Sequence, residues 1–329
     1  PAQLSNLKDE LDIKVLDRTL VILDIFASHA KSSEGKLQVE MAQLKYRSSR
    51  LMGLGKNLSR LGGGIGTRGP GESKLETDRR AIRERVSQLR TEIEKVESSR
   101  DTLRKHRMSD GIPVIAIVGY TNAGKSTFLN KITDAGILAE DKLFATLDPT
   151  TRSLKIPDGE EVLFTDTVGF ISKLPHNLVD AFKSTLEEAK YADLILHVAD
   201  ASNPEVDEQM KVVYRTLEEL KVVGKPVITF LNKQDKIDED RIIKDLKADA
   251  LVKGSAKTGE GIDLLLNKIS EVLREGKVLV DTLLSYADTA KIAVIRKKGQ
   301  LLSEEYEGDG IRVKAYVPKA VAGQLGLLR

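Results

Sequence analysis

The residues with the clearest chemical potential form a glycine-rich stretch, Gly119-Tyr-Thr-Asn-Ala-Gly-Lys-Ser126. The spacing G-x-x-x-x-G-K-S lets a tight loop point successive backbone N–H groups at phosphate oxygens. Lys125 is placed for the β- and γ-phosphates of a nucleotide, and Ser126 for Mg²⁺. An apolar run precedes the loop and a helical pattern follows it, which argues against a chance glycine turn. The predicted phosphate-binding residues are Gly119, Tyr120, Thr121, Asn122, Ala123, Gly124, Lys125, Ser126 and Thr127.

A second motif, Asn232-Lys233-Gln234-Asp235, selects the base. It follows an apolar run at the point where a parallel sheet binds its ligands. The Asp235 carboxylate has two acceptor oxygens, which suit the guanine N1–H and N2–H₂ donors; adenine has no such donor pair. Asn232 can bond the base and tie the loop back, and the stem of Lys233 can cover the ring. The sequence therefore predicts GTP as the substrate.

Three shorter motifs fall in the expected order along the chain. Asp166-Thr167-Val168-Gly169 supplies a carboxylate for Mg²⁺ and a backbone N–H that can sense the γ-phosphate. Phe144-Ala145-Thr146 offers a Mg²⁺-binding hydroxyl; we choose Thr146 over Thr150 and Thr151. Ser255-Ala256-Lys257 would support the base. The predicted metal ligands are Ser126, Thr146 and Asp166, and the predicted catalytic residues are Lys125, Thr146 and Gly169.

Two positions bear on the reaction rate. Many GTPases carry a Gln just after the D-x-x-G glycine to orient the attacking water. This chain has Phe170 there, so intrinsic hydrolysis should be slow, or another group must place the water. Asn122 occupies a loop position where some GTPases hold a K⁺ ion beside the phosphates. It can equally be a simple turn residue, and the sequence leaves both interpretations open.

The elements that must position these motifs lie in residues 111–276. Apolar runs at Ile112–Val118, Val162–Thr165, Leu194–Ala199, Val227–Leu231 and Leu251–Lys253 alternate with amphipathic stretches near Lys125–Thr133, Asn177–Lys190, Glu205–Val223 and Gly261–Arg274. This alternation predicts an α/β P-loop GTPase domain with a mostly parallel sheet and helices on both faces.

The flanking regions differ in pattern. Residues 37–110 show two heptad-like helical patterns around the glycine-rich Leu61–Gly71, which predicts an antiparallel helical hairpin. Residues 277–329 read as a small α+β domain, with strands at Ile292–Arg296 and Ile311–Val317 and helices at Asp281–Thr289 and Lys319–Leu327. The predicted domains are 1–36, 37–110, 111–276 and 277–329.

Composition bounds the class of protein. The chain has 329 residues, no Cys and a net charge of +2. Without Cys there is no disulfide framework, which fits a reducing cytoplasm, and no apolar stretch approaches membrane-spanning length. From Lys45 to Arg107 basic residues outnumber acidic ones by about two to one. That excess is compatible with binding nucleic acid and equally with an ordinary solvated coiled coil.

Several stretches beyond the nucleotide motifs carry a family resemblance. They are Asp17–Phe26, Glu34–Glu40, Gly62–Arg80 and the runs GYTNAGKST, FATLDPT and DTVGFI. Together they resemble the HflX family of ribosome-associated GTPases over essentially the whole chain. Residues 1–36 resemble only the last part of that family's N-terminal α/β domain.

The resemblance implies a cytoplasmic, monomeric GTPase that binds the large ribosomal subunit and ribosomal RNA and splits or rescues stalled ribosomes under stress such as heat. Three rivals stand beside it. The first is a GTP-gated RNA-binding assembly chaperone, and the second a regulatory switch with a protein partner. The third is an RNA remodeller using ATP through the N-terminal module. Residues 1–36 resemble only the last part of that module, so we expect little ATPase activity.

Overall fold

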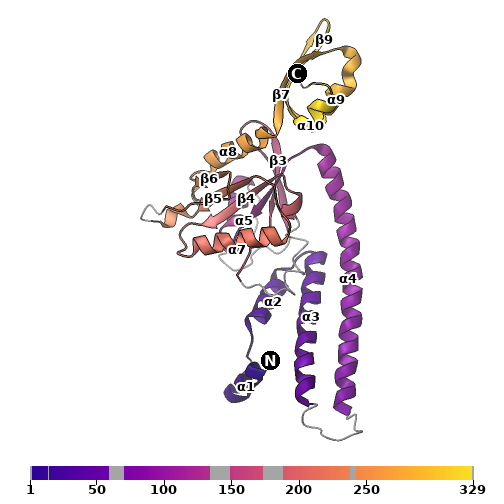
Figure 1. Cartoon of the computed structure of the whole chain (residues 1–329), viewed down its shortest axis with the longest axis vertical. Helices are drawn as coiled ribbons and strands as arrows, with labels where there is room; N and C mark the ends of the chain where they lie inside the picture. Colours follow the sequence, from indigo (N-terminus) through magenta and orange to yellow (C-terminus); the bar gives the residue numbers. More distant parts are fainter. Residues whose placement is uncertain are drawn as a thin grey trace. The chain divides into compact units, whose positions relative to one another are not determined.

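The structure, a computed structural model, describes residues 2–13, 15–58, 70–133, 149–172, 188–237 and 242–327. The chain divides into two compact units (Figure 1). The first contains the N-terminal helices up to Arg100, and the second contains both β-sheets.

The helical unit is built from α1 (Ala2–Leu11), α2 (Arg18–His29), α3 (Ser33–Leu58) and the N-terminal three quarters of α4 (Pro70–Asp110). Helix α2 starts at Asp17, whose carboxylate accepts from the Leu20 N–H at 2.9 Å and so satisfies a free donor of the first turn. Arg50 of α3 pairs with the same carboxylate. Ile22, Leu23 and Phe26 are the buried face of α2.

Helices α3 and α4 run side by side (Figure 1) and share an apolar seam, as the heptad pattern predicts. Met41 of α3 packs with Leu89 and Ile93 of α4, with Leu37, Leu44 and Val86 around them. Two ion pairs join the helices: Arg100 to Glu34 at 2.8 Å and Arg85 to Glu40 at 2.8 Å. The predicted first helix begins four residues earlier than expected, at Ser33.

The larger sheet contains β1 (Val114–Val118), β2 (Thr150–Lys155), β3 (Glu161–Asp166), β4 (Leu194–Asp200), β5 (Val227–Asn232) and β6 (Ala250–Lys253), in the order β2-β3-β1-β4-β5-β6. All neighbours are parallel except β2 and β3, which form a hairpin. Strand β4 is buried along six of its seven residues, as a central parallel strand must be.

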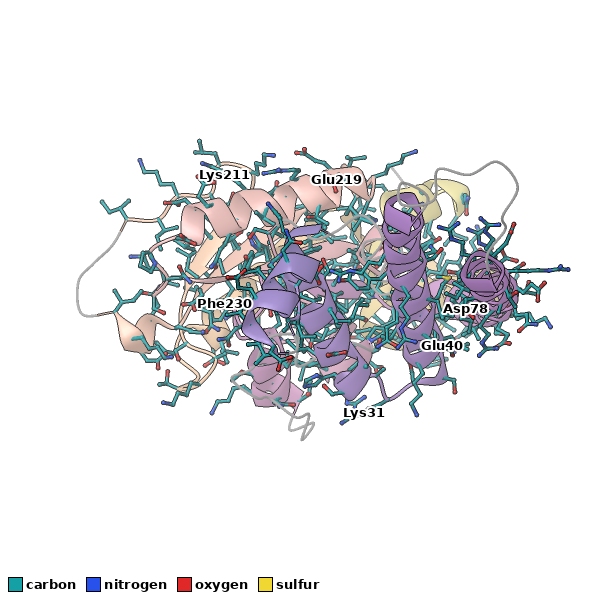
Figure 2. The ribbon with its side chains drawn as sticks, turned by 90° about the horizontal axis from the view of Figure 1, so that it is seen from below. Lys31, Glu40, Asp78, Lys211, Glu219 and Phe230 are labelled. Atoms are coloured by element: carbon teal, nitrogen blue, oxygen red, sulfur yellow. The ribbon has the colours of Figure 1, made fainter. Side chains whose placement is uncertain are left out.

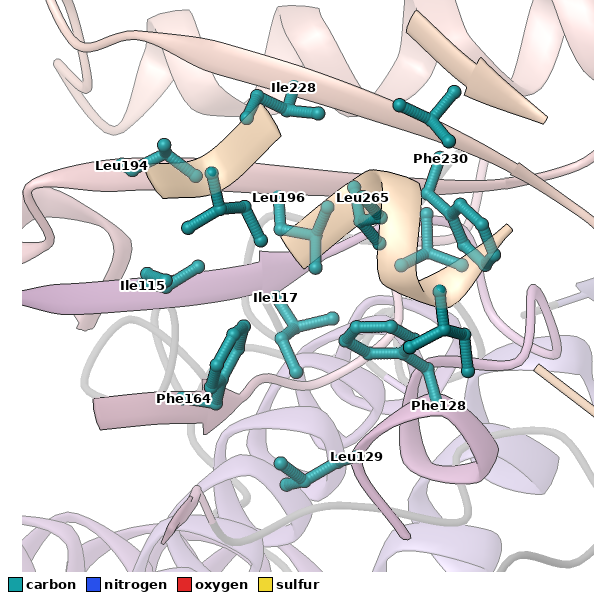
Figure 3. Packing of buried hydrophobic residues seen from close by; sticks show 14 of the residues in the cluster. Ile115, Ile117, Phe128, Leu129, Phe164, Leu194, Leu196, Ile228, Phe230 and Leu265 are labelled. Atoms are coloured by element: carbon teal, nitrogen blue, oxygen red, sulfur yellow. The ribbon is translucent and has the colours of Figure 1, made fainter. Parts of the chain in front are cut away.

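Helices α5 (Lys125–Thr133), α7 (Val206–Glu219) and α8 (Ile262–Glu275) pack on this sheet. Helix α7 buries Val206, Met210, Val213 and Leu217, while Lys211 and Glu219 project outward (Figure 2). The core on the other face centres on Phe128 of α5 (Figure 3). Its ring centroid lies 6.2 Å from that of Phe164 and 5.7 Å from that of Phe230. This packing anchors the first turn of α5 directly behind the glycine-rich loop.

A second, antiparallel sheet follows, made of β7 (Lys277–Leu284), β8 (Gln300–Glu307) and β9 (Gly310–Pro318) in the order β7-β9-β8. Val280, Leu284, Val313, Ala315 and Val317 form its buried face. That face packs on α9 (Thr289–Lys298) and α10 (Lys319–Gln324) through Ile292, Ile295 and Ala322. We call residues 277–327 the C-terminal domain.

Two predictions in this domain are wrong. Ile292–Arg296 was expected to be a strand because of its β-branched run, but it lies inside α9, where Ile292 and Ile295 share one helical face. Asp281–Thr289 was expected to be a helix, but β7 runs to Leu284 and turns alternate residues inward. Ile311–Val317 is a strand, as predicted, and the helix predicted at Lys319–Leu327 is present but ends at Gln324.

Two further expectations fall on parts of the chain outside the described residues: most of the helix expected at Asn177–Lys190, and most of the glycine-rich break at Leu61–Gly71. Among the helices that are described, none is long and apolar enough to cross a membrane.

Candidate nucleotide-binding site

The glycine-rich loop joins β1 to α5, and β1 lies between β3 and β4 in the sheet. Chain connections leave in opposite directions here, so the carboxyl ends of the strands frame a crevice. Gly124 has a φ of +97°, and a Cβ atom there would lie 2.2 Å from the Asn232 Nδ2 atom. Only glycine therefore lets the loop close against the base-binding motif. Helix α5 starts at Lys125 and directs its free N–H groups toward the crevice.

Lys125 is buried, with 6% of its surface exposed, and its Nζ atom donates to the Tyr120 carbonyl oxygen at 3.1 Å. Burial lowers the pKa of Lys125 to about 8, although the nearby Asp166 charge works in the opposite direction. The lowered pKa means that the negative charge around the buried Lys125 ammonium does not offset its loss of hydration. The site is therefore electrostatically suited to a polyanion such as a nucleotide phosphate.

Ser126 and Asp166 meet beside this lysine. The Ser126 hydroxyl donates to the Asp166 Oδ2 atom at 2.7 Å, and Asp166 is fully buried at the end of β3. A hydroxyl and a carboxylate are hard oxygen ligands, the kind that Mg²⁺ uses together with water and substrate phosphates. No three His, Cys, Asp or Glu side chains within the described residues form a separate metal cluster. The residues present fit a Mg²⁺ ion held jointly with a nucleotide.

The segment after Asp166 is bonded to the glycine-rich loop. Phe170 donates its N–H to the Gly119 carbonyl at 3.0 Å and accepts from the Thr121 N–H at 2.7 Å. The Phe170 side chain is buried. Thr167 is fixed through its hydroxyl, which donates to the Ile117 carbonyl oxygen at 2.7 Å. Gly169 consequently lies directly at the phosphate end of the crevice.

Asn232 ties three loops together at the base end. Its Nδ2 atom donates to the Ala123 carbonyl oxygen and its Oδ1 atom accepts from the Ala256 N–H, both at 2.8 Å. Ser255 donates to the Asp235 Oδ1 atom at 2.6 Å, which orients that exposed carboxylate. The Ser255-Ala256-Lys257 stretch is thus bonded to both Asn232 and Asp235.

One residue at this site, Asp200, is not among those predicted from the sequence. Asp200 ends β4, opposite Asn232 in the parallel register, and its Oδ2 atom pairs with the Lys233 Nζ atom at 2.8 Å. The same Nζ atom donates to the Asn122 carbonyl oxygen at 2.8 Å. Lys233 has a φ of +66°, so its backbone is held in an uncommon conformation. Its place in the site follows from the order of the strands, which puts the end of β4 beside the end of β5.

The structure brings together the residues predicted in the glycine-rich loop, Asp166–Gly169, Asn232–Asp235 and Ser255–Lys257. Gln234 donates from its Nε2 atom to the Leu231 carbonyl oxygen at 3.1 Å. Phe144, Ala145 and Thr146 lie outside the described residues. Thr150 and Thr151 belong to β2, where the Thr151 hydroxyl bonds that of Thr165 at 2.9 Å.

A glycine-rich loop between a strand and a helix of a mostly parallel sheet, joined through Asn232 to the motif that carries Asp235, defines a P-loop GTPase. Three family models match the chain: an N-terminal and a middle region of GTP-binding GTPases over residues 1–27 and 29–107, and a 50S ribosome-binding GTPase over residues 114–233. The protein belongs to the HflX family of GTPases.

The relatives support this assignment over the length of the chain. GTPase HflX of Lacrimispora saccharolytica is 61% identical, over 99% of this chain and 77% of its own. GTPase HflX of Escherichia coli is 47% identical, over 86% of this chain and 67% of its own. A GTP-binding protein of Sulfolobus solfataricus in complex with GDP shares the fold with a TM-score of 0.50 and 29% identity, covering 79% of this chain and 73% of its own.

Proposed function

We propose that the protein binds the large ribosomal subunit in its GTP-bound state and splits or rescues stalled ribosomes under stress such as heat. The observation that carries this proposal is the match of residues 114–233 to the family model described as a 50S ribosome-binding GTPase. On this proposal the protein works as a monomer in the cytoplasm, contacts ribosomal RNA and is released when GTP is hydrolysed.

The α3–α4 hairpin supports contact with RNA. Arg83, Arg90 and Lys95 are exposed along α4 and can bind phosphates in a salt-dependent way. Arg80 is exposed as well, although it pairs with Glu84 at the surface. Not every arginine of α4 is available for this. Arg85 and Arg100 are engaged by Glu40 and Glu34, so we assign those two to the stability of the hairpin.

At the nucleotide, we assign Lys125 to the β- and γ-phosphates and Asp235 to guanine. Ser126 and Asp166 would hold Mg²⁺, with Thr146 joining them in the GTP-bound state. When bound, Mg²⁺ neutralises charge on the phosphate oxygens. The Gly169 N–H would report the γ-phosphate, because Gly169 lies against Lys125. Hydrolysis needs a positioned water, and the buried Phe170 side chain has no group that can position it. The ribosome therefore supplies the missing positioning, and intrinsic hydrolysis is slow.

We further propose that Asn122 contributes a ligand to a K⁺ ion beside the phosphates. Its side chain is exposed at the mouth of the loop, which supports this role. Its φ of +62° gives the residue a purely structural explanation as well, because Asn tolerates the left-handed conformation better than most residues. Only an ion comparison separates the two.

The decisive experiment measures GTP hydrolysis with and without purified large ribosomal subunits, in K⁺ and in Na⁺ buffer. We expect the subunits to stimulate the rate by about a hundredfold or more, as activating partners of slow GTPases do. A rate that depends on K⁺ would assign Asn122 its ion. GTP binding with no response to ribosomes would leave the GTPase in place and overturn the ribosomal partner.

Sucrose-gradient profiles of intact ribosomes separate splitting from its rivals. Conversion of whole ribosomes into subunits by the factor with GTP supports splitting. Subunit binding without conversion favours an assembly chaperone. A protein partner retained by the hairpin after RNase treatment would favour a regulatory switch, and ATP hydrolysis by the intact chain would favour a remodeller.

A further inference from the structure

The turn of the β2–β3 hairpin is in contact with residues at the start of the C-terminal domain and at the end of α8. Lys277, at the start of β7, forms an ion pair with Glu160. Gln300, at the start of β8, donates from Nε2 to the Asp158 carbonyl oxygen at 2.9 Å. Arg274, in the last turn of α8, reaches the Asp158 Oδ2 atom at 3.0 Å. We call these five residues the hairpin clamp.

Most of the clamp is shielded from water, which sets it apart from ordinary surface ion pairs, although the side chain of Arg274 is 37% exposed. The side chains of Lys277 and Glu160 are 10% and 9% exposed, and that of Asp158 is 4% exposed. Removing one member of a buried pair leaves an unpaired charge away from water, which is strongly unfavourable. By contrast, the Lys268–Glu271 pair of α8 is 41% and 59% exposed, and such pairs contribute little. The hairpin turn is thus held firmly in place.

The other end of the same hairpin is the nucleotide site. The antiparallel register runs from Lys155 opposite Glu161, next to the clamp, to Thr150 opposite Asp166. Strand β3 continues from Asp166 into Gly169 and the Phe170 contacts with the glycine-rich loop. At about 3.3 Å per residue, the six paired positions form a connection of roughly 20 Å between clamp and site.

The register of the β2–β3 pairing needs an interaction that fixes it. A slip of two residues would keep every side chain on its own face of the sheet, so the pleat alone does not forbid it. It would, however, move the start of β2 away from Asp166. The pairing of β2 with β3 sets the distance between the start of β2 and Asp166. The clamp holds the hairpin turn in place and so keeps this pairing from shifting.

We propose that the C-terminal domain holds the β2–β3 hairpin in the register that GTP requires, with Lys277 as the principal positioning residue. GTP binding depends on where β2 begins and on the segment after Asp166. GDP has no γ-phosphate and relies on the glycine-rich loop and the base-binding loops. Loosening the clamp therefore weakens GTP more than GDP. By linkage, bound GTP tightens the clamp to the same degree.

The test compares nucleotide affinities of the full chain and its Lys277→Met variant, using a fluorescent non-hydrolysable GTP analogue and fluorescent GDP. We expect the Kd of the GTP analogue to rise about tenfold and that of GDP less than about threefold, a typical range for coupled sites. Lys268→Met, the same substitution in the exposed pair of α8, is the matched control and should change neither value.

Two further variants guard against a trivial loss of folding. The double exchange Glu160→Lys with Lys277→Glu restores opposite charges and should return the affinity ratio toward that of the parent chain. Gln300→Leu removes only the bond to the Asp158 carbonyl and should shift the ratio in the same direction as Lys277→Met, to a smaller extent. Equal weakening of both nucleotides across these variants, or no change in the ratio, would overturn the proposal.

Discussion

Gly169 lies directly against Lys125: a Cβ atom on Gly169 would come within 3.0 Å of the Lys125 Nζ atom and within 2.7 Å of the Thr121 Cα atom. The second contact is with backbone, which cannot simply rotate away. Any side chain at position 169 must therefore displace the segment after Asp166 from the glycine-rich loop.

Gly169→Ala should consequently uncouple nucleotide binding from hydrolysis. We expect GTP hydrolysis in the presence of ribosomal subunits to fall by about tenfold or more, as happens when catalytic geometry shifts by about 1 Å. GDP affinity should change little, because the loop and the base-binding residues remain. Gly224→Ala is a useful comparison, since a Cβ there meets nothing within 4 Å although its φ of +69° adds backbone strain. Normal turnover by Gly169→Ala would contradict the assigned role.

Ser126→Asn should abolish Mg²⁺-dependent GTP binding. The substitution places an amide where the hydroxyl now contacts Asp166 at 2.7 Å. We expect affinity to fall about a hundredfold, which corresponds to about 2.7 kcal/mol. Chelating Mg²⁺ with EDTA should weaken GTP binding by the parent chain and have little further effect on the variant. Ser99→Asn on the exposed face of α4 controls for the substitution itself. Tight GTP binding by Ser126→Asn would refute the metal assignment.

Asp235→Asn should move base preference from guanine toward xanthine, because the amide can donate where the carboxylate only accepts. The loss of hydrogen bonds to a charged acceptor predicts a fall in GTP affinity of about a hundredfold. Ser255→Ala should weaken GTP without changing the preference, since Ser255 only orients the carboxylate. Competition among GTP, XTP and ATP measures both. Asp263→Asn, on the exposed first turn of α8, is the control.

A buried polar network predicts acid sensitivity. Asp245 accepts from the hydroxyls of Thr229 at 2.6 Å and Tyr214 at 2.7 Å, and His197 lies 3.7 Å away. Burial alone would raise the pKa of Asp245, but the interaction with His197 and the hydrogen bonds from Thr229 and Tyr214 outweigh it and lower the pKa.

A carboxylate with a lowered pKa stabilises the fold above its unfolded pKa, near 4, and loses that contribution as pH falls toward its folded pKa. Asp245→Asn should therefore be less stable than the parent chain at pH 7, by about 1–3 kcal/mol. The gap should narrow below about pH 4. Denaturant unfolding at pH 7, 5 and 3.5 measures this. A gap that stays constant with pH would show that the charge of Asp245 does not matter.

The parallel sheet and its loops were predictable because their signals are local. Each motif follows an apolar run, and the glycines of the loop are dictated by geometry such as the closeness of Gly124 to Asn232. Strand β2 was not predicted, since its pattern is weak and its partner β3 supplies the pairing. Two elements of the C-terminal domain, at Asp281–Thr289 and Ile292–Arg296, were also predicted wrongly. The run at Ile292 has strand propensity, but Ile292 and Ile295 instead pack from a helix against the sheet formed by the flanking strands.

Contacts between residues far apart in sequence were beyond prediction. Nothing in the neighbourhood of Lys277 indicates that it meets Glu160, and the bond from Lys233 to Asp200 required the order of the strands. The roles of Thr146 and Asn122 remain predictions.

The two hydrogen bonds of the Asn232 side chain fix the distance between the two ends of the crevice. Because one amide group holds both the Ala123 carbonyl and the Ala256 N–H, the loop that grips phosphates and the loop that backs the base cannot drift apart independently. The site therefore fits a ligand with one particular distance between its base and its phosphates. A substitution of Asn232 would loosen both ends of the crevice. The affinity for pyrophosphate, which has no base, should therefore change as well.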